Sequence, residues 1–140
     1  MATAATREAT ADDSGHGGLQ TFISAGPVRF VADEPIDHGG LDLGPTPHDL
    51  VSAGLAACTT ITLRVYSKRK GWPLGPVHVG VSHHRDATAT PTDLFIRTIT
   101  LPEGLDDEQR KRLIEIANMC PIHRLLTAGV AIETVLTPKG

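Results

Sequence analysis

One long helix with well-marked ends constrains this chain more than any other feature. Thr46 is a typical N-cap, Pro47 suits the first helical position, and Asp49 completes a capping box with Thr46. At the other end, three basic residues precede Gly71, which suits the position just after a helix. Cations in a last turn also interact favourably with the helix dipole. The sequence therefore predicts a helix of about 24 residues, ~36 Å long.

This predicted helix is apolar on nearly every side from Leu50 to Val65, which is typical of a buried helix. A folded body of about 120 residues, an ordinary size for one domain, offers few other elements to wrap a helix of that length. We therefore expect the helix to be covered by a second copy of the chain. The prediction is an interlocked homodimer with the two central helices side by side.

The remaining pattern predicts an α+β domain with antiparallel sheets around the long central helix. Turn residues separate short β-prone runs, and a loop over Asp33–Pro45 leads into the helix. A second helix begins at Asp106 with a capping box, and a short third helix begins at Cys120. The expected strands are Leu19–Ser24, Val28–Ala32, a run through Val77, Val79 and Val81, Leu94–Leu101, and an alternating run from Val130 to Leu136.

Residues 1–18 contain scarcely a large apolar side chain, so we expect a disordered tail followed by one domain over residues 19–140. The tail lacks the basic start and apolar run of a secretory signal, which predicts a cytoplasmic protein. We expect no membrane partner, because no uninterrupted apolar stretch reaches about 18–20 residues. A formal charge of −3 argues against nucleic acid as a partner.

Two cysteines are too few for a disulfide scaffold. The function of the chain depends on whether they are catalytic, bind a metal or are simply buried. Cys120 precedes Pro121 at a predicted helix N-terminus, where backbone N–H groups favour a thiolate. Cys58 lies in the middle of the predicted helix, and its position alone is typical of a small apolar core residue. Any lowering of its pKa would need a cation from another element. Arg29 and Arg124 are the candidates, and we favour Arg29, reaching in from the same or the partner subunit.

Two segments resemble the OsmC/Ohr superfamily. The first runs from Gly39-Gly40 through GPTPHDL and Ala56-Ala57-Cys58-Thr59 to KRKGWP, and is similar to the central helix of OsmC-type proteins. The second, NMCPIHR around Cys120, is similar to their second-cysteine segment. Together with the matching order of elements, the resemblance covers about Leu19 to Leu136.

The resemblance implies an OsmC-like fold, a homodimer with active sites at the subunit interface, and a thiol-dependent peroxidase acting on organic hydroperoxides or hydrogen peroxide. It identifies Cys58 as the peroxidatic cysteine, oxidised to a sulfenate, and Cys120 as the resolving cysteine that closes a disulfide. An external dithiol, of the lipoyl type in this family, would reduce that disulfide, and neither a metal nor an organic cofactor is expected. His48, Leu55 and Arg124 are the expected substrate contacts.

The sequence departs from the organic-hydroperoxide branch at one position. That branch carries a glutamate ten residues before the first cysteine, where this chain has His48, with Asp49 beside it. The sequence is therefore closer to the less characterised OsmC-like branch. Asp49 has two interpretations, as the catalytic acid that orients the activating arginine or as the capping-box acid of the helix.

Two other functions compete with the peroxidase. Cys58, Cys120, His48 and His123 are potential metal ligands, but the cysteines stand 62 positions apart and lack the local pairs typical of zinc sites, so we predict no metal. The non-enzyme alternative is an OsmC-like dimer that binds a small ligand or senses redox state through its thiols.

Overall fold

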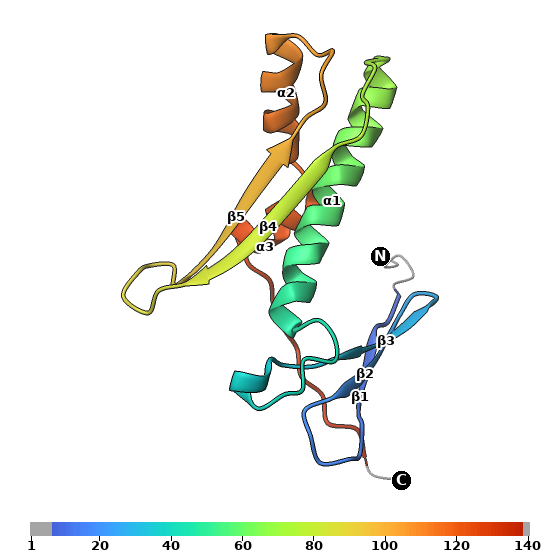
Figure 1. Ribbon diagram of the computed structural model, residues 1–140, viewed down its shortest axis with the longest axis vertical. Coiled ribbons are helices and arrows are strands. Elements are labelled where there is room, and N and C mark those ends of the chain that lie inside the picture. The colour runs from blue at the N-terminus through green and yellow to red at the C-terminus, as the bar shows by residue number, and fades with distance from the viewer. Residues whose placement is uncertain (1–6, 139–140) are drawn as a thin grey trace. The chain divides into compact units, whose positions relative to one another are not determined.

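The computed structural model describes residues 7–138 as two compact units, Met1–Ser52 and Ala53–Gly140, each of which is considered by itself. The N-terminal unit is a three-stranded antiparallel sheet in the order β1 (Thr10–Asp13), β2 (Thr21–Ala25) and β3 (Val28–Ala32) (Figure 1). The hairpin predicted from the turn residues is confirmed, with Phe22 opposite Val31 and Ser24 opposite Arg29.

The expectation of a disordered tail over residues 1–18 is wrong for Thr10–Asp13, because this segment forms strand β1. All four residues are exposed, and Ala11 lies opposite Ile23 of β2. The prediction considered only apolar burial, whereas an edge strand is also held by the backbone hydrogen bonds that it shares with its neighbour. Residues 1–6 of the expected tail lie outside the described residues.

The loop from Asp33 to Pro45 includes a short 3₁₀ helix over Ile36–His38 and folds around the buried carboxylate of Asp33. This carboxylate accepts hydrogen bonds from Gln20 Nε2 and from the backbone N–H groups of Glu34, Leu41 and Leu43. Burial alone would raise the pKa of Asp33, but these hydrogen bonds outweigh it and hold the pKa below its ordinary value.

Close backbone packing fixes the same loop at Gly44. A Cβ atom at Gly44 would overlap the carbonyl group of Val31, so this position requires glycine. The segment that leads into the long helix is therefore held by hydrogen bonding and by backbone approach.

The long helix α1 spans Pro47–Lys70, and both of its predicted ends are confirmed. Thr46 Oγ1 accepts from the Asp49 N–H at 3.0 Å while Asp49 Oδ2 accepts from the Thr46 N–H at 3.0 Å, which completes the capping box. Gly71 follows the last turn with φ of 72°, the left-handed conformation typical of a helix C-terminus.

In the single chain, α1 is buried on one face only, and its expected cover by a second copy stays a prediction. Its buried residues form one stripe, each member one turn after the last, and consist of Leu55, Thr59, Leu63 and Ser67. Ile61 and Val65 are 62% and 52% exposed. The physical reason is that one chain supplies elements for one face of this helix only.

By length and apolar character, α1 is also the one helix of the described residues that could cross a membrane, with 22% of its apolar window buried. Core helices of proteins that never enter a membrane meet the same criterion, so this is weak evidence. The expected absence of a membrane partner therefore stays a prediction.

The C-terminal unit combines the rest of α1 with a hairpin of β4 (His78–Arg85) and β5 (Asp93–Thr100) and with helices α2 (Asp107–Ala117) and α3 (Pro121–Ala128). The two strands form the predicted antiparallel pair and appear in Figure 1 as one long twisted hairpin. The capping box of Asp106 and Gln109 at the start of α2 is confirmed. The core of this unit is an apolar cluster of Leu63, Leu74, Leu113, Ile116 and Ala117.

The strand expected from Val130 to Leu136 is absent, since the chain after α3 is irregular and exposed to residue 138. Ile132 and Leu136 are 85% and 93% exposed. A strand forms only where a neighbouring edge supplies hydrogen bonds, and no other described strand pairs with this segment. The observed order is therefore β-β-β-α-β-β-α-α rather than the expected ββ-α-ββ-α-α-β.

Candidate thiol site

Cys58 lies in the middle of α1, beside the buried stripe rather than within it. Its side chain is half-buried, and its Sγ lies 4.0 Å from Thr62 Oγ1 one turn later. The next residue, Thr59, is fully buried and donates its hydroxyl hydrogen to the Leu55 carbonyl oxygen at 2.7 Å. The helix therefore presents the first sulfur at the border between its buried and its open face.

Cys120 lies in the short link between α2 and α3 and is completely buried. It is the N-cap of α3, and its Sγ accepts a hydrogen bond from the His123 N–H at 3.3 Å. Pro121 stands at the first helical position, which needs no N–H donor. The predicted placement of this cysteine at a helix N-terminus is confirmed.

Opposing effects act on the Cys120 thiol. Burial raises its pKa, but hydrogen bonding, first of all from the His123 N–H and with smaller effects of Cys58, Thr59 and Ile122, outweighs burial and lowers the pKa below its ordinary value. Thr59 Oγ1 lies 4.0 Å from Cys120 Sγ. Two sulfurs that stand 62 positions apart in the sequence are thus neighbours at one buried site.

Arg97 is the residue of this site that the sequence reasoning missed. Its Nη1 donates to Thr59 Oγ1 at 3.0 Å and to the Ala117 carbonyl oxygen at 3.2 Å. Its Nη2 donates to Asn118 Oδ1 at 2.8 Å and contacts His123 Nδ1 at 3.2 Å. A signal was present in β5, where Arg97 shares its half-buried face with Phe95 and Ile99 and so occupies an inward position of the strand.

His123 connects this arginine to an open pocket. Burial and the positive charge of Arg97 lower the pKa of His123, which favours a neutral ring. With Nδ1 accepting from Arg97, we assign the ring proton to Nε2. His123 and Leu55 line a pocket of about 520 Å³ whose other walls are mainly apolar, formed by Pro91, Asp93, Leu94, Phe95, Leu126 and Thr127.

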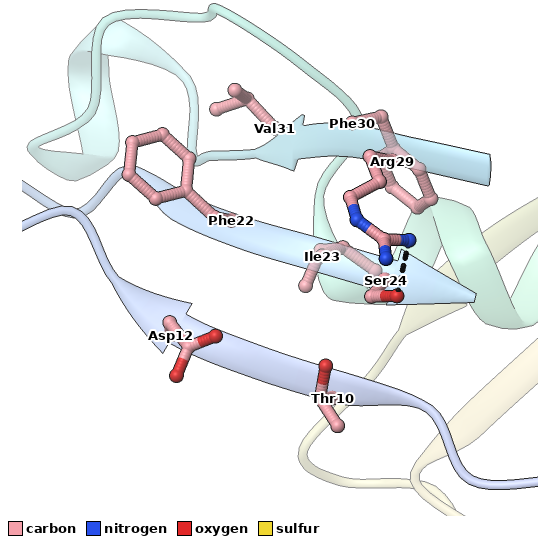
Figure 2. Close-up of a pocket in the computed structure, with 8 residues that line it drawn as sticks. All are labelled: Thr10, Asp12, Phe22, Ile23, Ser24, Arg29, Phe30 and Val31. Carbon is pink, nitrogen blue, oxygen red and sulfur yellow. Dashed lines mark hydrogen bonds between the residues drawn. The ribbon is translucent and has the colours of Figure 1, made fainter.

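The other predicted site residues take different positions. Arg29 lies in the N-terminal unit, where its Nη1 donates to Ser24 Oγ at 2.8 Å across the sheet (Figure 2). It lines a hollow of about 530 Å³ with Thr10, Asp12, Phe22, Ile23, Ser24, Phe30 and Val31. His48 is exposed in the first turn of α1, and Arg124 is exposed on α3.

Asp49 acts as the capping-box acid of α1, which is one of its two interpretations. The catalytic role expected of Arg29 and Asp49, and the substrate contacts expected of His48, Leu55 and Arg124, stay predictions. Within residues 7–138, no three His, Cys, Asp or Glu side chains lie close enough together to hold a metal ion.

Comparisons with known proteins agree with this architecture. The family model described as OsmC-like protein matches residues 38–135. An organic hydroperoxide resistance protein from Elizabethkingia anophelis is 25% identical, with a TM-score of 0.66 over 89% of each chain. No curated protein matches the chain.

Two further solved structures share the fold at lower identity. An organic hydroperoxide resistance protein OsmC from Legionella pneumophila is 22% identical, with a TM-score of 0.66 over 89% of this chain and 91% of the other. An OsmC-like protein from Mycoplasma pneumoniae is 18% identical, with a TM-score of 0.68 over 89% of each chain. Since the family model spans more than half of the sequence, the chain belongs to the OsmC-like protein family.

Proposed function

We propose that this protein is a thiol-dependent peroxidase that reduces organic hydroperoxides or hydrogen peroxide through a Cys58 sulfenate and a Cys58–Cys120 disulfide. The observation that carries the proposal is the placement of two free thiols at one site, since the Cys120 sulfur lies 4.0 Å from the hydroxyl oxygen of Thr59, the residue after Cys58. A lone buried cysteine would have no such partner. Membership of a family that includes hydroperoxide resistance proteins supports the same function.

The exposure of the two cysteines supports the roles that we propose for them. Cys58 is half-buried and within reach of a small molecule, whereas Cys120 is completely buried. A peroxide therefore meets Cys58 first. Hydrogen bonding outweighs burial and lowers the pKa of Cys120, so we propose that Cys120 carries the negative charge of the reduced pair.

This distribution makes Cys120 the base for the first step. As the Cys58 sulfur attacks the peroxide, its proton passes to Cys120, an S–O bond forms, the O–O bond breaks, and the departing alkoxide takes a proton from water. Cys58 is then a sulfenic acid. The Cys120 sulfur next attacks the Cys58 sulfur, and its proton leaves with the hydroxyl group as water. The cysteine pair loses two electrons and the peroxide gains two.

The return to the reduced state needs an external dithiol, and we propose one of the lipoyl type, acting in the cytoplasm. The dithiol would attack the disulfide and leave oxidised itself, so that electrons balance over the cycle. Neither step in this scheme requires a metal or an organic cofactor.

We propose that a second copy of the chain completes the fold. The exposed apolar face of α1 at Ile61 and Val65 needs a cover, and the alternating segment from Val130 to Leu136 needs a strand edge. A second copy would cover the apolar face and pair with the segment, because each chain has the same open helix face and the same open sheet edges. In such a dimer, Arg29 of the partner is a candidate to act at Cys58.

The test is a thiol count on reduced protein mixed with one equivalent of cumene hydroperoxide. We expect rapid loss of both thiols per chain in the wild type. Cys120→Ser should undergo one stoichiometric oxidation, trapped as a sulfenic acid, and Cys58→Ser should not turn over. Normal turnover by Cys58→Ser would refute the assignment of roles.

One observation favours the non-catalytic alternative. The mainly apolar pocket beside Leu55 and His123 is large enough for a small ligand, which suits a binding or redox-sensing dimer. The same thiol count separates the two functions, because a binder or sensor would lose its thiols slowly or only in part.

A further inference from the structure

A single guanidinium group joins the segments that carry the two sulfurs. Arg97 reaches from β5 to Thr59 on α1, to the Ala117 carbonyl oxygen at the end of α2, and to His123 on α3. It also binds Asn118 in the link between α2 and α3. Three of its four partners therefore lie one on each of the three helices at the thiol site, and the fourth lies in the link between α2 and α3.

The partners of Arg97 carry no formal negative charge. They are a hydroxyl, a backbone carbonyl, a side-chain amide and a neutral imidazole, and within residues 7–138 Arg97 forms no ion pair. An arginine held only by neutral acceptors contributes through the fixed geometry of its planar fork rather than through charge neutralisation.

The contacts of Arg97 flank both sulfurs. Thr59 is the residue after Cys58, whereas Asn118 and His123 stand two residues before and three residues after Cys120. His123 is also the residue whose backbone N–H binds the Cys120 sulfur. Displacement of the Arg97 fork would therefore shift the Cys120 segment against α1.

Disulfide closure is sensitive to such a shift, because the S–S bond forms only over a narrow range of Cα separations and torsion angles. Attack of peroxide on Cys58 tolerates such a shift better, because the peroxide diffuses in and the proton can pass to Cys120 directly or through one water. We propose that Arg97 is a positioning residue for the second step, in which it holds the Cys120 sulfur where it can attack the Cys58 sulfenic acid. This inference rests on the proposed peroxidase function.

The test follows the two steps separately in reduced full-length protein given one equivalent of cumene hydroperoxide. Dimedone traps the sulfenic acid, and acid quenching with alkylation counts the disulfide. In Arg97→Met we expect sulfenic acid to form within about twofold of the wild-type rate and the disulfide to form on the order of 10- to 100-fold more slowly, the range expected for a misplaced reacting group. The dimedone adduct should become the main product.

Two further variants separate geometry from charge and from loss of folding. Arg97→Lys keeps the charge but not the fork, so it should behave like Arg97→Met. Thr59→Val removes the acceptor on α1 with little change in volume, and it should slow disulfide closure even if Arg97→Met fails to fold. Full recovery of closure in Arg97→Lys, or closure at the wild-type rate in Thr59→Val, would overturn the proposal.

Arg64→Met is the matched control. Arg64 lies on the same helix as Cys58 and donates to the Leu74 and Gly75 carbonyl oxygens instead of the thiol site. We expect this variant to lose stability while both chemical steps keep their rates. A slowing of closure in Arg64→Met equal to that in Arg97→Met would refute a specific role for Arg97.

A separate experiment with diamide tests the role of Arg97 independently of the proposed peroxidase function. Diamide oxidises a thiol pair to a disulfide without a peroxide, so it reports closure alone. If the wild type ignores hydroperoxide, the peroxidase proposal fails, and diamide still tests Arg97. Slower closure in Arg97→Met than in the wild type supports the positioning role, and equal rates overturn it.

Discussion

Leu63→Ala tests whether the core beneath the thiol site is packed as described. Leu63 has no exposed surface and lies in the apolar cluster with Leu74, Leu113, Ile116 and Ala117. It stands one turn after Thr59 on the buried stripe of α1. The substitution therefore removes apolar volume next to the segment that holds the sulfurs.

The expected loss follows from two contributions. Three carbon atoms removed from a buried site cost roughly 2.4 kcal/mol at about 0.8 kcal/mol per methylene group. The cavity left behind adds to this, and buried Leu→Ala substitutions as a class cost about 2.7–5.0 kcal/mol. Because Leu63 has no exposed surface and packs against residues of α2, we expect about 3–4 kcal/mol, near the middle of that range.

Urea denaturation followed by far-UV circular dichroism measures this loss, at one fixed protein concentration because association would add to stability. With an m-value of about 2 kcal/mol/M, the midpoint should fall by roughly 1.5–2 M with m unchanged. Ile36→Ala is the control, since Ile36 is 74% exposed, and it should change stability by less than about 0.5 kcal/mol. A fall of less than about 0.5 M for Leu63→Ala would refute the packing described.

Two other outcomes follow from the structure. Because hydrogen bonding lowers the folded pKa of Asp33, its carboxylate stabilises the fold above about pH 3.9, the pKa of an unfolded aspartate, and this contribution is lost as the pH falls through the folded pKa. The difference in urea midpoint between wild type and Asp33→Asn should therefore narrow from pH 6 to pH 3, and a constant difference would contradict the assignment. Truncation after Gly129 should convert the proposed dimer to monomer in analytical ultracentrifugation while leaving the helical circular dichroism signal; an intact dimer would show that the C-terminal segment does not join the copies.

The sequence predicted the elements whose ends have local signals. The ends of α1 at Thr46 and Gly71, the capping box of α2 and the N-cap position of Cys120 all depend on a few adjacent residues. Such signals act through backbone hydrogen bonds near the same residues, so the sequence of one short segment is sufficient to predict where a helix begins or ends. The antiparallel hairpins were predicted on a similar basis, from turn residues between β-prone runs.

The features that the sequence did not reveal depend on contacts between distant segments. Strand β1 lacks apolar residues and exists through its pairing with β2. The alternating segment from Val130 to Leu136 has the pattern of a strand but no edge to join in the single chain. Arg97 was overlooked because its four partners come from three separate helices and the link between two of them.

The choice of activating arginine shows the same limit more sharply. Reasoning from the sequence favoured Arg29 as the cation that acts at Cys58; in the single chain Arg29 donates to Ser24 within the N-terminal sheet, and its role at Cys58 stays a prediction. At the thiol site, hydrogen bonding, first of all from the His123 N–H, outweighs burial and lowers the pKa of Cys120.

In the proposed mechanism, Cys120 accepts the proton that Cys58 loses, and an arginine from a partner subunit would act beside it. Arg97 has a different task in our proposal from the activation of Cys58 that the sequence reasoning expected of an arginine. It would hold the Cys120 segment against α1 through neutral acceptors, and the rate expected to depend on it is the rate of S–S closure.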